Sequence, residues 1–426
     1  YEHGEGVEKD LEESFSWYQK SADLGDPRGL FSVARAYDYG IGVPQDMEQA
    51  AKWYTAAADA GSAPAACDLG VCYERGEGVP QDFEKAVELY RKAAEMGNAP
   101  GQCNLGFMYE SGQGVEQSWE EAVKWYSAAA QQGFPRAMCN LAWCYETGSG
   151  VETNLTRAFH WYRKAAEQGD PRGMFCLGLC YKHGKGVDAD SAEAAQWYRR
   201  AADTGYPRAM CNLGVCYEFG EGVEEDLEQA VSFYRQAAEK GDPAGQCNLG
   251  YMYETGRGVE QSYEESARLY ERSAKGGYPR AMCCLGYCYE SGQGVEKDLA
   301  AAAGWYKAAA EAGDSTGACN LGYLYETGEG VEQSWEQAVT YYRQAAERGQ
   351  ARGQYLLGWC YEHGKGVKAD AAKARQLYQA SAEQNYSHAA EALERLKSAP
   401  KAEQEKKAPE KKEKGGFFKG LFGGRK

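Results

Sequence analysis

Fifteen cysteines have the widest chemical repertoire in this 426-residue sequence, because thiolates bind metals, form disulfides and act as nucleophiles. Thirteen of them recur at two positions that lie five residues apart, and each position repeats at multiples of 36 residues. The first set is Cys67, Cys103, Cys139, Cys211, Cys247, Cys283 and Cys319, the second is Cys72, Cys144, Cys180, Cys216, Cys288 and Cys360, and the other two are Cys176 and Cys284. What these thiols can do depends on the elements that carry them.

The spacing of the cysteines argues against disulfides and metal sites. All of them lie in the first of the two predicted helices of their repeats. Thiols five residues apart on one helix point in different directions, whereas a disulfide needs Cα atoms within about 7 Å. Cys176/Cys180 and Cys284/Cys288 are four residues apart and could face one ion, but no histidine or second cysteine pair is placed to complete a tetrahedral site. We therefore predict no metal, no cofactor, and reduced thiols that pack as small apolar groups. This favours the cytoplasm or another reducing compartment.

Two tyrosine series reveal the elements behind this pattern. One series runs from Tyr1 to Tyr361 and the other from Tyr18 to Tyr378, both in steps of 36 residues without an insertion. These two series contain 22 of the 32 tyrosines, and we call their members the frame tyrosines. A fixed period of this length is typical of a solenoid, in which each unit buries its apolar face only against its neighbours. The sequence therefore predicts eleven repeats over residues 1–385.

Each repeat contains two helical patterns with explicit start and stop signals. In residues 135–146, apolar side chains recur at helical spacing, and Gly148 follows where a left-handed residue ends a helix. The second helix of each repeat starts after a residue with a side-chain oxygen, as an N-cap requires. It stops at a glycine in ten repeats and at Asn385 in the last. The predicted caps are Asp10, Asp46, Asp82, Ser118, Asn154, Asp190, Asp226, Ser262, Asp298, Ser334 and Asp370.

The other candidate catalytic motifs are better explained by a structural role in the repeats than by catalysis. Gly-x-Gly-Val stands in all eleven repeats, but it follows a helix and lacks the Lys-Ser/Thr of a phosphate-binding loop, which indicates a turn. The histidines form no His-x-x-x-His pair and suggest no Ser-His-Asp set; they are His3, His160, His183, His363 and His388. We therefore predict no catalytic residues, and we interpret the histidines as ordinary sequence variation in surface loops.

Charge and hydropathy restrict the partners. The net charge is −16 at a mean hydropathy of −0.68, and the longest apolar runs are too short to predict a membrane-spanning helix. Residues 398–426 carry nine basic and four acidic groups, or +5, which leaves −16 − 5 = −21 for the rest. An acidic body excludes nucleic acid as the main partner, because phosphate binding needs stripes of Lys and Arg. It suits basic or neutral protein partners.

The unit A-x-x-x-L-G-x-x-Y-x-x-G-x-G-V followed by D-x-x-x-A-x-x-W-Y-x-x-A-A-x-x-G resembles the Sel-1-like repeat, a relative of the tetratricopeptide repeat. The resemblance covers roughly residues 1–397 and implies an all-α, right-handed superhelical solenoid of antiparallel helix pairs that acts as an adaptor. A cysteine-rich bacterial branch has been associated with binding or hydrolysing penicillins, which is the enzymatic alternative; its second cysteine lies on the other helix, where this sequence has none. Residues that carry the match include Ala209, Leu213, Gly214, Tyr217, Gly220, Gly222, Val223, Asp226, Ala230, Tyr234, Ala237, Ala238 and Gly241.

The same resemblance implies that residues flanking Leu-Gly on the first helix line a concave groove. An arginine position, an asparagine position and an aromatic position recur there, and such side chains can bind carboxylates, peptide backbone and apolar anchors of a partner peptide or helix. The alternative is that some asparagines only bond neighbouring repeats and some aromatics are core. The three rows are Arg28, Arg136, Arg172, Arg208, Arg280 and Arg352; Asn104, Asn140, Asn212, Asn248 and Asn320; and Phe107, Trp143, Tyr251, Tyr287, Tyr323 and Trp359.

The C-terminal region departs from the period. Residues 386–397 resemble a capping helix, residues 398–414 are rich in Lys, Glu and Pro and predict a disordered linker, and residues 415–426 form a short Phe/Gly/basic motif. In that motif, Phe417, Phe418, Leu421 and Phe422 share one face of a helical turn or two beside basic residues. This predicts a docking peptide, a contact with a membrane surface, or a segment that folds back onto the acidic solenoid and occupies its groove. Because the chain opens at Tyr1 in mid-repeat, we expect an upstream half-repeat, and any targeting signal, outside this sequence.

Overall fold

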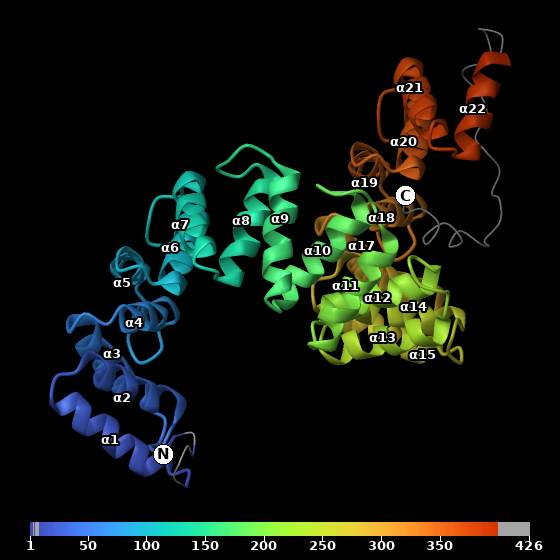
Figure 1. Cartoon of the computed structure of the whole chain (residues 1–426). Helices are drawn as coiled ribbons and strands as arrows, with labels where there is room; N and C mark the ends of the chain where they lie inside the picture. The colour runs from blue at the N-terminus through green and yellow to red at the C-terminus, as the bar shows by residue number, and fades with distance from the viewer. Residues whose placement is uncertain (3, 5–7, 399–426) are drawn as a thin grey trace. The chain divides into compact units, whose positions relative to one another are not determined.

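The computed structural model describes residues 1–2, 4 and 8–398, which form 22 α-helices and no β-strand (Figure 1). The helices follow one another in antiparallel pairs joined by short turns, as the 36-residue period predicts. The chain divides into two compact units, residues 1–237 and 238–426, with the division inside one helix. The predicted all-α solenoid of helix pairs is confirmed.

The first helix of each pair carries the first tyrosine series and the second helix carries the second series. The first helices are α2 (Pro27–Tyr39), α4 (Ala63–Arg75), α6 (Ala99–Ser111), α8 (Pro135–Thr147), α10 (Pro171–His183), α12 (Pro207–Phe219), α14 (Pro243–Thr255), α16 (Pro279–Ser291), α18 (Ser315–Thr327) and α20 (Ala351–His363), and α22 (Ser387–Ser398) follows the last pair. The second helices are α1 (Leu11–Asp23), α3 (Met47–Asp59), α5 (Phe83–Glu95), α7 (Trp119–Gln131), α9 (Leu155–Glu167), α11 (Ser191–Asp203), α13 (Leu227–Glu239), α15 (Tyr263–Lys275), α17 (Leu299–Glu311), α19 (Trp335–Glu347) and α21 (Ala371–Ala382).

The predicted start and stop signals of the second helices are confirmed. At all eleven starts, the side chain of the cap accepts a hydrogen bond of 2.9–3.3 Å from the backbone N–H three residues later. The ten predicted stop glycines have φ between +77° and +97°, and Asn385, at φ +63°, is the one non-glycine residue with positive φ among the described residues. Local chemistry therefore fixes the boundaries of these helices.

The second glycine of the Gly-x-Gly-Val turn determines how successive pairs pack. Gly114 has φ +68°, and a Cβ placed on it would lie 2.2 Å from the carbonyl oxygen of Phe83, the first residue of α5 in the preceding pair. The turn therefore rests directly on the start of a neighbouring helix, and only glycine permits this approach. The interpretation of the motif as a turn is confirmed.

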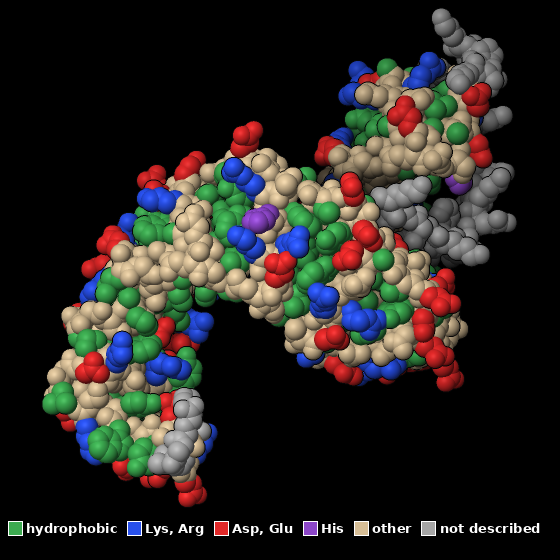
Figure 2. Space-filling model, in the orientation of Figure 1, with side chains coloured by type: hydrophobic (Ala, Val, Ile, Leu, Met, Phe, Trp, Pro, Cys, Tyr) green, Lys and Arg blue, Asp and Glu red, His purple; other side chains and the backbone are tan. Residues whose placement is uncertain are grey.

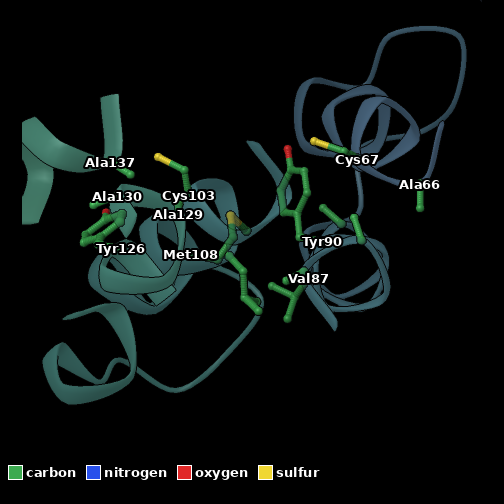
Figure 3. Packing of buried hydrophobic residues seen from close by; sticks show 14 of the residues in the cluster. Ala66, Cys67, Val87, Tyr90, Cys103, Met108, Tyr126, Ala129, Ala130 and Ala137 are labelled. Atoms are coloured by element: carbon green, nitrogen blue, oxygen red, sulfur yellow. The ribbon is translucent and has the colours of Figure 1, made fainter. Parts of the chain in front are cut away.

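Buried tyrosines from the second helices form the centre of each pair (Figure 3). Tyr90 and Tyr126 are fully buried. A Cβ on Gly106 of α6 would lie 2.7 Å from the ring of Tyr126 on α7, so the missing side chain allows the two helices to approach closely. Ala129 and Ala130 complete this packing with small side chains.

Successive first helices lie closer together than successive second helices. Within the described residues, α4 contacts α6 and α8 contacts α10 in unit one, while α16 contacts α18 and α18 contacts α20 in unit two; no pair of successive second helices makes comparable contacts. The row of first helices is therefore the inner side of the stack within each unit. This is the side on which we predicted the binding face.

Candidate functional site

The three predicted rows of arginine, asparagine and aromatic side chains all lie on first helices, and together we call them the first-helix face. Every row position recurs once per pair, so equivalent side chains of successive repeats are neighbours. Their environments differ, however, and they divide into side chains that bond neighbouring repeats and side chains that are exposed. Acidic and basic side chains alternate with apolar ones over the visible surface in Figure 2.

The asparagine row joins one repeat to the next. Asn140 is buried, and its carbonyl oxygen accepts a hydrogen bond of 2.8 Å from a guanidinium N–H of Arg172 on the following first helix. The same bond, also 2.8 Å, links Arg352 to the buried Asn320. The amide of Asn104 approaches the Cys67 sulfur of the preceding repeat at 3.7 Å. These contacts match the alternative in which asparagines bond neighbouring repeats, and any binding role for them stays a prediction.

The arginine row contains both exposed and partly buried members. Arg136 and Arg208 are exposed, and the guanidinium of Arg208 lies over the ring of Phe175, 5.5 Å from its centre. Arg172 is also exposed, although it bonds Asn140, whereas Arg280 is partly buried in unit two. A partner could reach Arg136 and Arg208 most directly. Asn212 and Asn248 of the asparagine row are half-buried.

The aromatic row offers the largest accessible apolar groups of this face. Trp143 is 36% exposed and Tyr323 is 39% exposed, while Tyr287 is half-buried. Trp143 packs on Trp119 with ring centres 5.6 Å apart, and Trp359 makes the equivalent contact with Trp335 at 5.8 Å. Aromatic side chains that are held on one side by the scaffold and open on the other are typical anchors for a partner.

One recurring contact was missed by the sequence reasoning. The hydroxyl of the second-series tyrosine donates a hydrogen bond to the carboxylate that directly follows the first-series tyrosine, 16 residues earlier, and we call this series the tyrosine–carboxylate ladder. Nine of these bonds measure 2.5–3.0 Å, and Tyr18 bonds Glu2 in the same way. The signal in the sequence is an acidic residue after the frame tyrosine in ten of eleven repeats. The carboxylates are Glu2, Asp38, Glu74, Glu110, Glu146, Glu218, Glu254, Glu290, Glu326 and Glu362.

The ladder has one interruption. In the sixth repeat, Lys182 replaces the carboxylate, and its amine instead pairs with Glu221 at 2.7 Å. The hydroxyl of Tyr198, which would donate to this position, is buried and makes no well-formed hydrogen bond in the described part of the chain, although the side chain of Asn212 lies beside it. A buried hydroxyl without a partner costs about 1–3 kcal/mol.

We therefore expect that restoring the carboxylate stabilises the protein. The double variant Lys182→Glu/Glu221→Gln supplies an acceptor for Tyr198 and removes the charge that would repel the new carboxylate. It does so at the expense of one partly buried ion pair, worth about 1 kcal/mol. Urea denaturation followed by circular dichroism should show a free energy of unfolding raised by about 1 kcal/mol. Adding Tyr198→Phe should abolish the gain, and a gain that survives this third substitution would contradict the hydrogen-bond explanation.

The cysteines lie within the packed interior, as predicted. All fifteen are free, and all are buried except the half-buried Cys176. Burial raises the pKa of Cys67 to about 12 and that of Cys103 to about 11. Almost none of either thiol is therefore thiolate at neutral pH, so neither is an activated nucleophile. No group of three or more His, Cys, Asp or Glu side chains within the described residues is arranged to hold a metal ion.

Some predictions concern residues outside the described part of the chain. The docking residues Phe417, Phe418, Leu421 and Phe422, the linker 398–414 apart from Ser398, and His3 all lie there. Among the described helices, none has the length and hydropathy needed to cross a bilayer. The roles proposed for the C-terminal tail stay predictions.

The Sel1 repeat model matches eleven consecutive segments of the chain, residues 1–26, 27–62, 63–98, 99–134, 135–170, 171–206, 207–242, 243–278, 279–314, 315–350 and 351–386. The fold is similar to the crystal structure of c5321, a protective antigen of uropathogenic Escherichia coli with an SLR fold, at 32% identity over 92% of this chain and 91% of that one, with a TM-score of 0.56. A Sel1 repeat protein of Oxalobacter formigenes is 35% identical over 57% of this chain and 96% of its own, with a TM-score of 0.53. A search of curated proteins finds no match.

The repeat model and the two structures agree with the caps, glycine turns and helix pairs described above. The model covers the chain from residue 1 to residue 386, which includes every described helix pair. The chain therefore belongs to the Sel1 repeat family.

Proposed function

We propose that this protein is a non-enzymatic adaptor that binds peptide or helical segments of other proteins on its first-helix face. Sel1 repeat solenoids are typically scaffolds for protein interactions. The observation that supports this site is the exposure of Trp143, Arg136 and Arg208 on the inner row of helices in unit one. An exposed aromatic ring and exposed guanidinium groups on one row of helices favour a partner that contributes apolar and acidic or backbone groups.

The features that would support the β-lactam alternative are not found in the described residues. In the cysteine-rich branch of the family, bridges join the two helices of a repeat, whereas all fifteen thiols here are free and lie on first helices. Reduced thiols support a reducing compartment, such as the cytoplasm, as the place where the adaptor acts.

Affinity capture with matched variants tests the adaptor proposal. We expect Arg136→Ala/Trp143→Ala/Arg208→Ala to lose most of the proteins that the wild-type chain recovers from lysate of its source cells, as identified by mass spectrometry. The control variant Trp17→Ala/Arg163→Ala/Arg200→Ala removes the same residue types from exposed positions on second helices of unit one.

Both variants should keep the helical circular dichroism signal, because the altered side chains are exposed. Equal recovery by the two variants, or unchanged recovery by the first, would show that partners do not use this face.

A further inference from the structure

Unit two carries an uninterrupted series of aromatic and acidic side chains along four successive first helices. In α14, α16, α18 and α20, an aromatic residue of the aromatic row precedes a ladder glutamate by three residues. Residues three apart are neighbours on a helix surface, so each helix presents a ring beside a carboxylate. In unit one, Leu179 with Lys182 and Val215 with Glu218 break the series. The four pairs of unit two are Tyr251/Glu254, Tyr287/Glu290, Tyr323/Glu326 and Trp359/Glu362.

In the part of the chain that the structure describes, three of the four ladder glutamates of unit two, Glu254, Glu290 and Glu326, accept a hydrogen bond on one carboxylate oxygen only. Tyr270, Tyr306 and Tyr342 donate to Oε2 of Glu254, Glu290 and Glu326 at 2.6, 2.5 and 2.6 Å. These three glutamates form no salt bridge with a lysine or arginine of the described residues. Their Oε1 atoms are therefore acceptors with capacity for a cation.

The chain itself shows how a cation occupies such an oxygen. On the last glutamate of the series, Arg395 of α22 donates from Nη1 to Oε1 of Glu362 at 2.7 Å and from Nη2 to Oε2 at 2.8 Å, while Tyr378 still donates to Oε2. In unit one, the amine of Lys185 lies 2.6 Å from Oε1 of Glu146. A ladder glutamate can thus hold its tyrosine and a cation together.

The position of Arg395 in the repeat shows which side chains lie beside the other ladder glutamates. It lies 36 residues after Trp359 and so occupies the next position of the aromatic row. By the same register, Tyr287 lies beside Glu254 and Tyr323 beside Glu290 of the preceding helix. The electrostatics agree, because burial and the carboxylates of Glu254 and Glu290 raise the pKa of Tyr287. Each site therefore joins a carboxylate and the face or edge of an aromatic ring.

Poorly solvated negative charge gives these sites a reason to bind cations. Burial raises the pKa of Glu254 and Glu326, which shows that water stabilises their charge poorly. The positive charges of Arg280 and Arg352 lower the pKa of Glu254 and Glu326 in turn, but less than burial raises it. Residues 1–397 carry a net charge of −21, obtained by subtracting the +5 of residues 398–426 from −16, so a basic segment is also attracted over a distance.

We propose that Glu254, Glu290 and Glu326, with the rings beside them, bind an extended basic segment of a partner protein that carries arginine at every third residue. First helices of successive repeats are spaced by about 8–10 Å. In an extended polyproline II segment, residues three apart lie on the same side and are separated by about 9 Å, so such arginines reach successive carboxylates. Each guanidinium donates to Oε1 and packs against an aromatic ring, as charge-assisted and cation–π contacts require. This assignment rests on the proposed adaptor function, and it specifies that the partner segment bound by unit two is basic.

Fluorescence anisotropy with the full chain and a fluorescein-labelled peptide tests the proposal. The probe is (Arg-Thr-Ser) repeated four times, and the reference peptides have the same composition with four contiguous arginines, or citrulline in place of arginine. The variant Glu254→Gln/Glu290→Gln/Glu326→Gln keeps the oxygen that accepts from tyrosine, so it should fold. The control Glu311→Gln/Glu336→Gln/Glu347→Gln removes the same charge from exposed positions on second helices of unit two.

We expect the spaced-arginine peptide to bind more tightly than both reference peptides. The ladder variant should weaken this binding about tenfold or more, since loss of a charge-assisted hydrogen bond costs about 1.5–3 kcal/mol and 1.4 kcal/mol is tenfold in affinity. The control should change it less than about twofold, because exposed charges act weakly. Equal losses in the two variants, equal binding of spaced and contiguous arginines, or no binding by the wild type would overturn the proposal. None of these results affects the capture experiment on unit one, so the two proposals fail separately.

Discussion

Replacing Gly114 with alanine is expected to lower the free energy of unfolding by about 3 kcal/mol. Two effects combine. A residue with a Cβ at φ +68° costs about 1–2 kcal/mol, and forcing the Cβ away from a backbone oxygen 2.2 Å distant adds about 1–3 kcal/mol of displacement. The oxygen belongs to Phe83 of α5, which cannot move without disturbing the start of that helix. Urea denaturation followed by circular dichroism measures the loss.

Gly97→Ala is the matched control for this substitution. Gly97 ends α5 with φ +81°, yet nothing lies within 4 Å of a Cβ placed there. It therefore shares the backbone strain and lacks the clash, and we expect a loss of about 1–2 kcal/mol. Similar losses at the two positions would mean that φ alone, and not contact with the preceding pair, explains the turn glycine.

The contact at Gly114 also explains how the turn acts on the whole stack. It joins the turn after α6 to the start of α5, so it belongs to the interface between repeats and not to one helix pair. In solenoids, stability is approximately the sum of repeat terms and nearest-neighbour interface terms. Damage to one interface should therefore uncouple neighbouring repeats, which would broaden the unfolding transition as well as shift it.

The helix boundaries could be predicted from the sequence because they depend on local chemistry. Each capping side chain bonds a backbone N–H three residues away, and each stop residue adopts its own left-handed conformation. Asn385 illustrates this: it replaces a glycine and keeps φ +63°. Such features need no knowledge of the distant chain, and the strict period then extends them to every repeat.

The candidate site could be predicted only in part, because its side chains depend on neighbouring repeats. The sequence places Asn140 and Trp143 on the same helix, but it does not show that Asn140 is buried against Arg172 of the next repeat while Trp143 remains exposed. Both outcomes result from the packing of successive first helices. The role of Glu110 was missed for a similar reason, since its partner Tyr126 lies on the other helix of the pair.

Removing the buried ring of Tyr126 is expected to destabilise the protein more than the substitution of Gly114. Tyr126→Ala should lower the free energy of unfolding by about 3–5 kcal/mol, because a fully buried aromatic side chain is lost and the backbone of α6 and α7 cannot collapse into the cavity. The neighbouring Gly106 has no side chain to fill the space. A loss below about 2 kcal/mol would show that the helices rearrange and that the ring is not central to the pair.

Tyr126→Phe separates the ring from the hydroxyl, and Tyr198→Phe provides its control. The Tyr126 hydroxyl donates to Glu110 at 2.5 Å, so its removal should cost about 1–2 kcal/mol, whereas the Tyr198 hydroxyl has no carboxylate to bond. Tyr198→Phe should therefore be neutral or stabilising, although both rings are fully buried. Equal costs at the two positions would mean that the hydroxyls contribute through general packing, and that the recurring acidic residue after the frame tyrosine does not stabilise the solenoid. Unequal costs in the expected order would identify the ladder as a stabilising element of the solenoid.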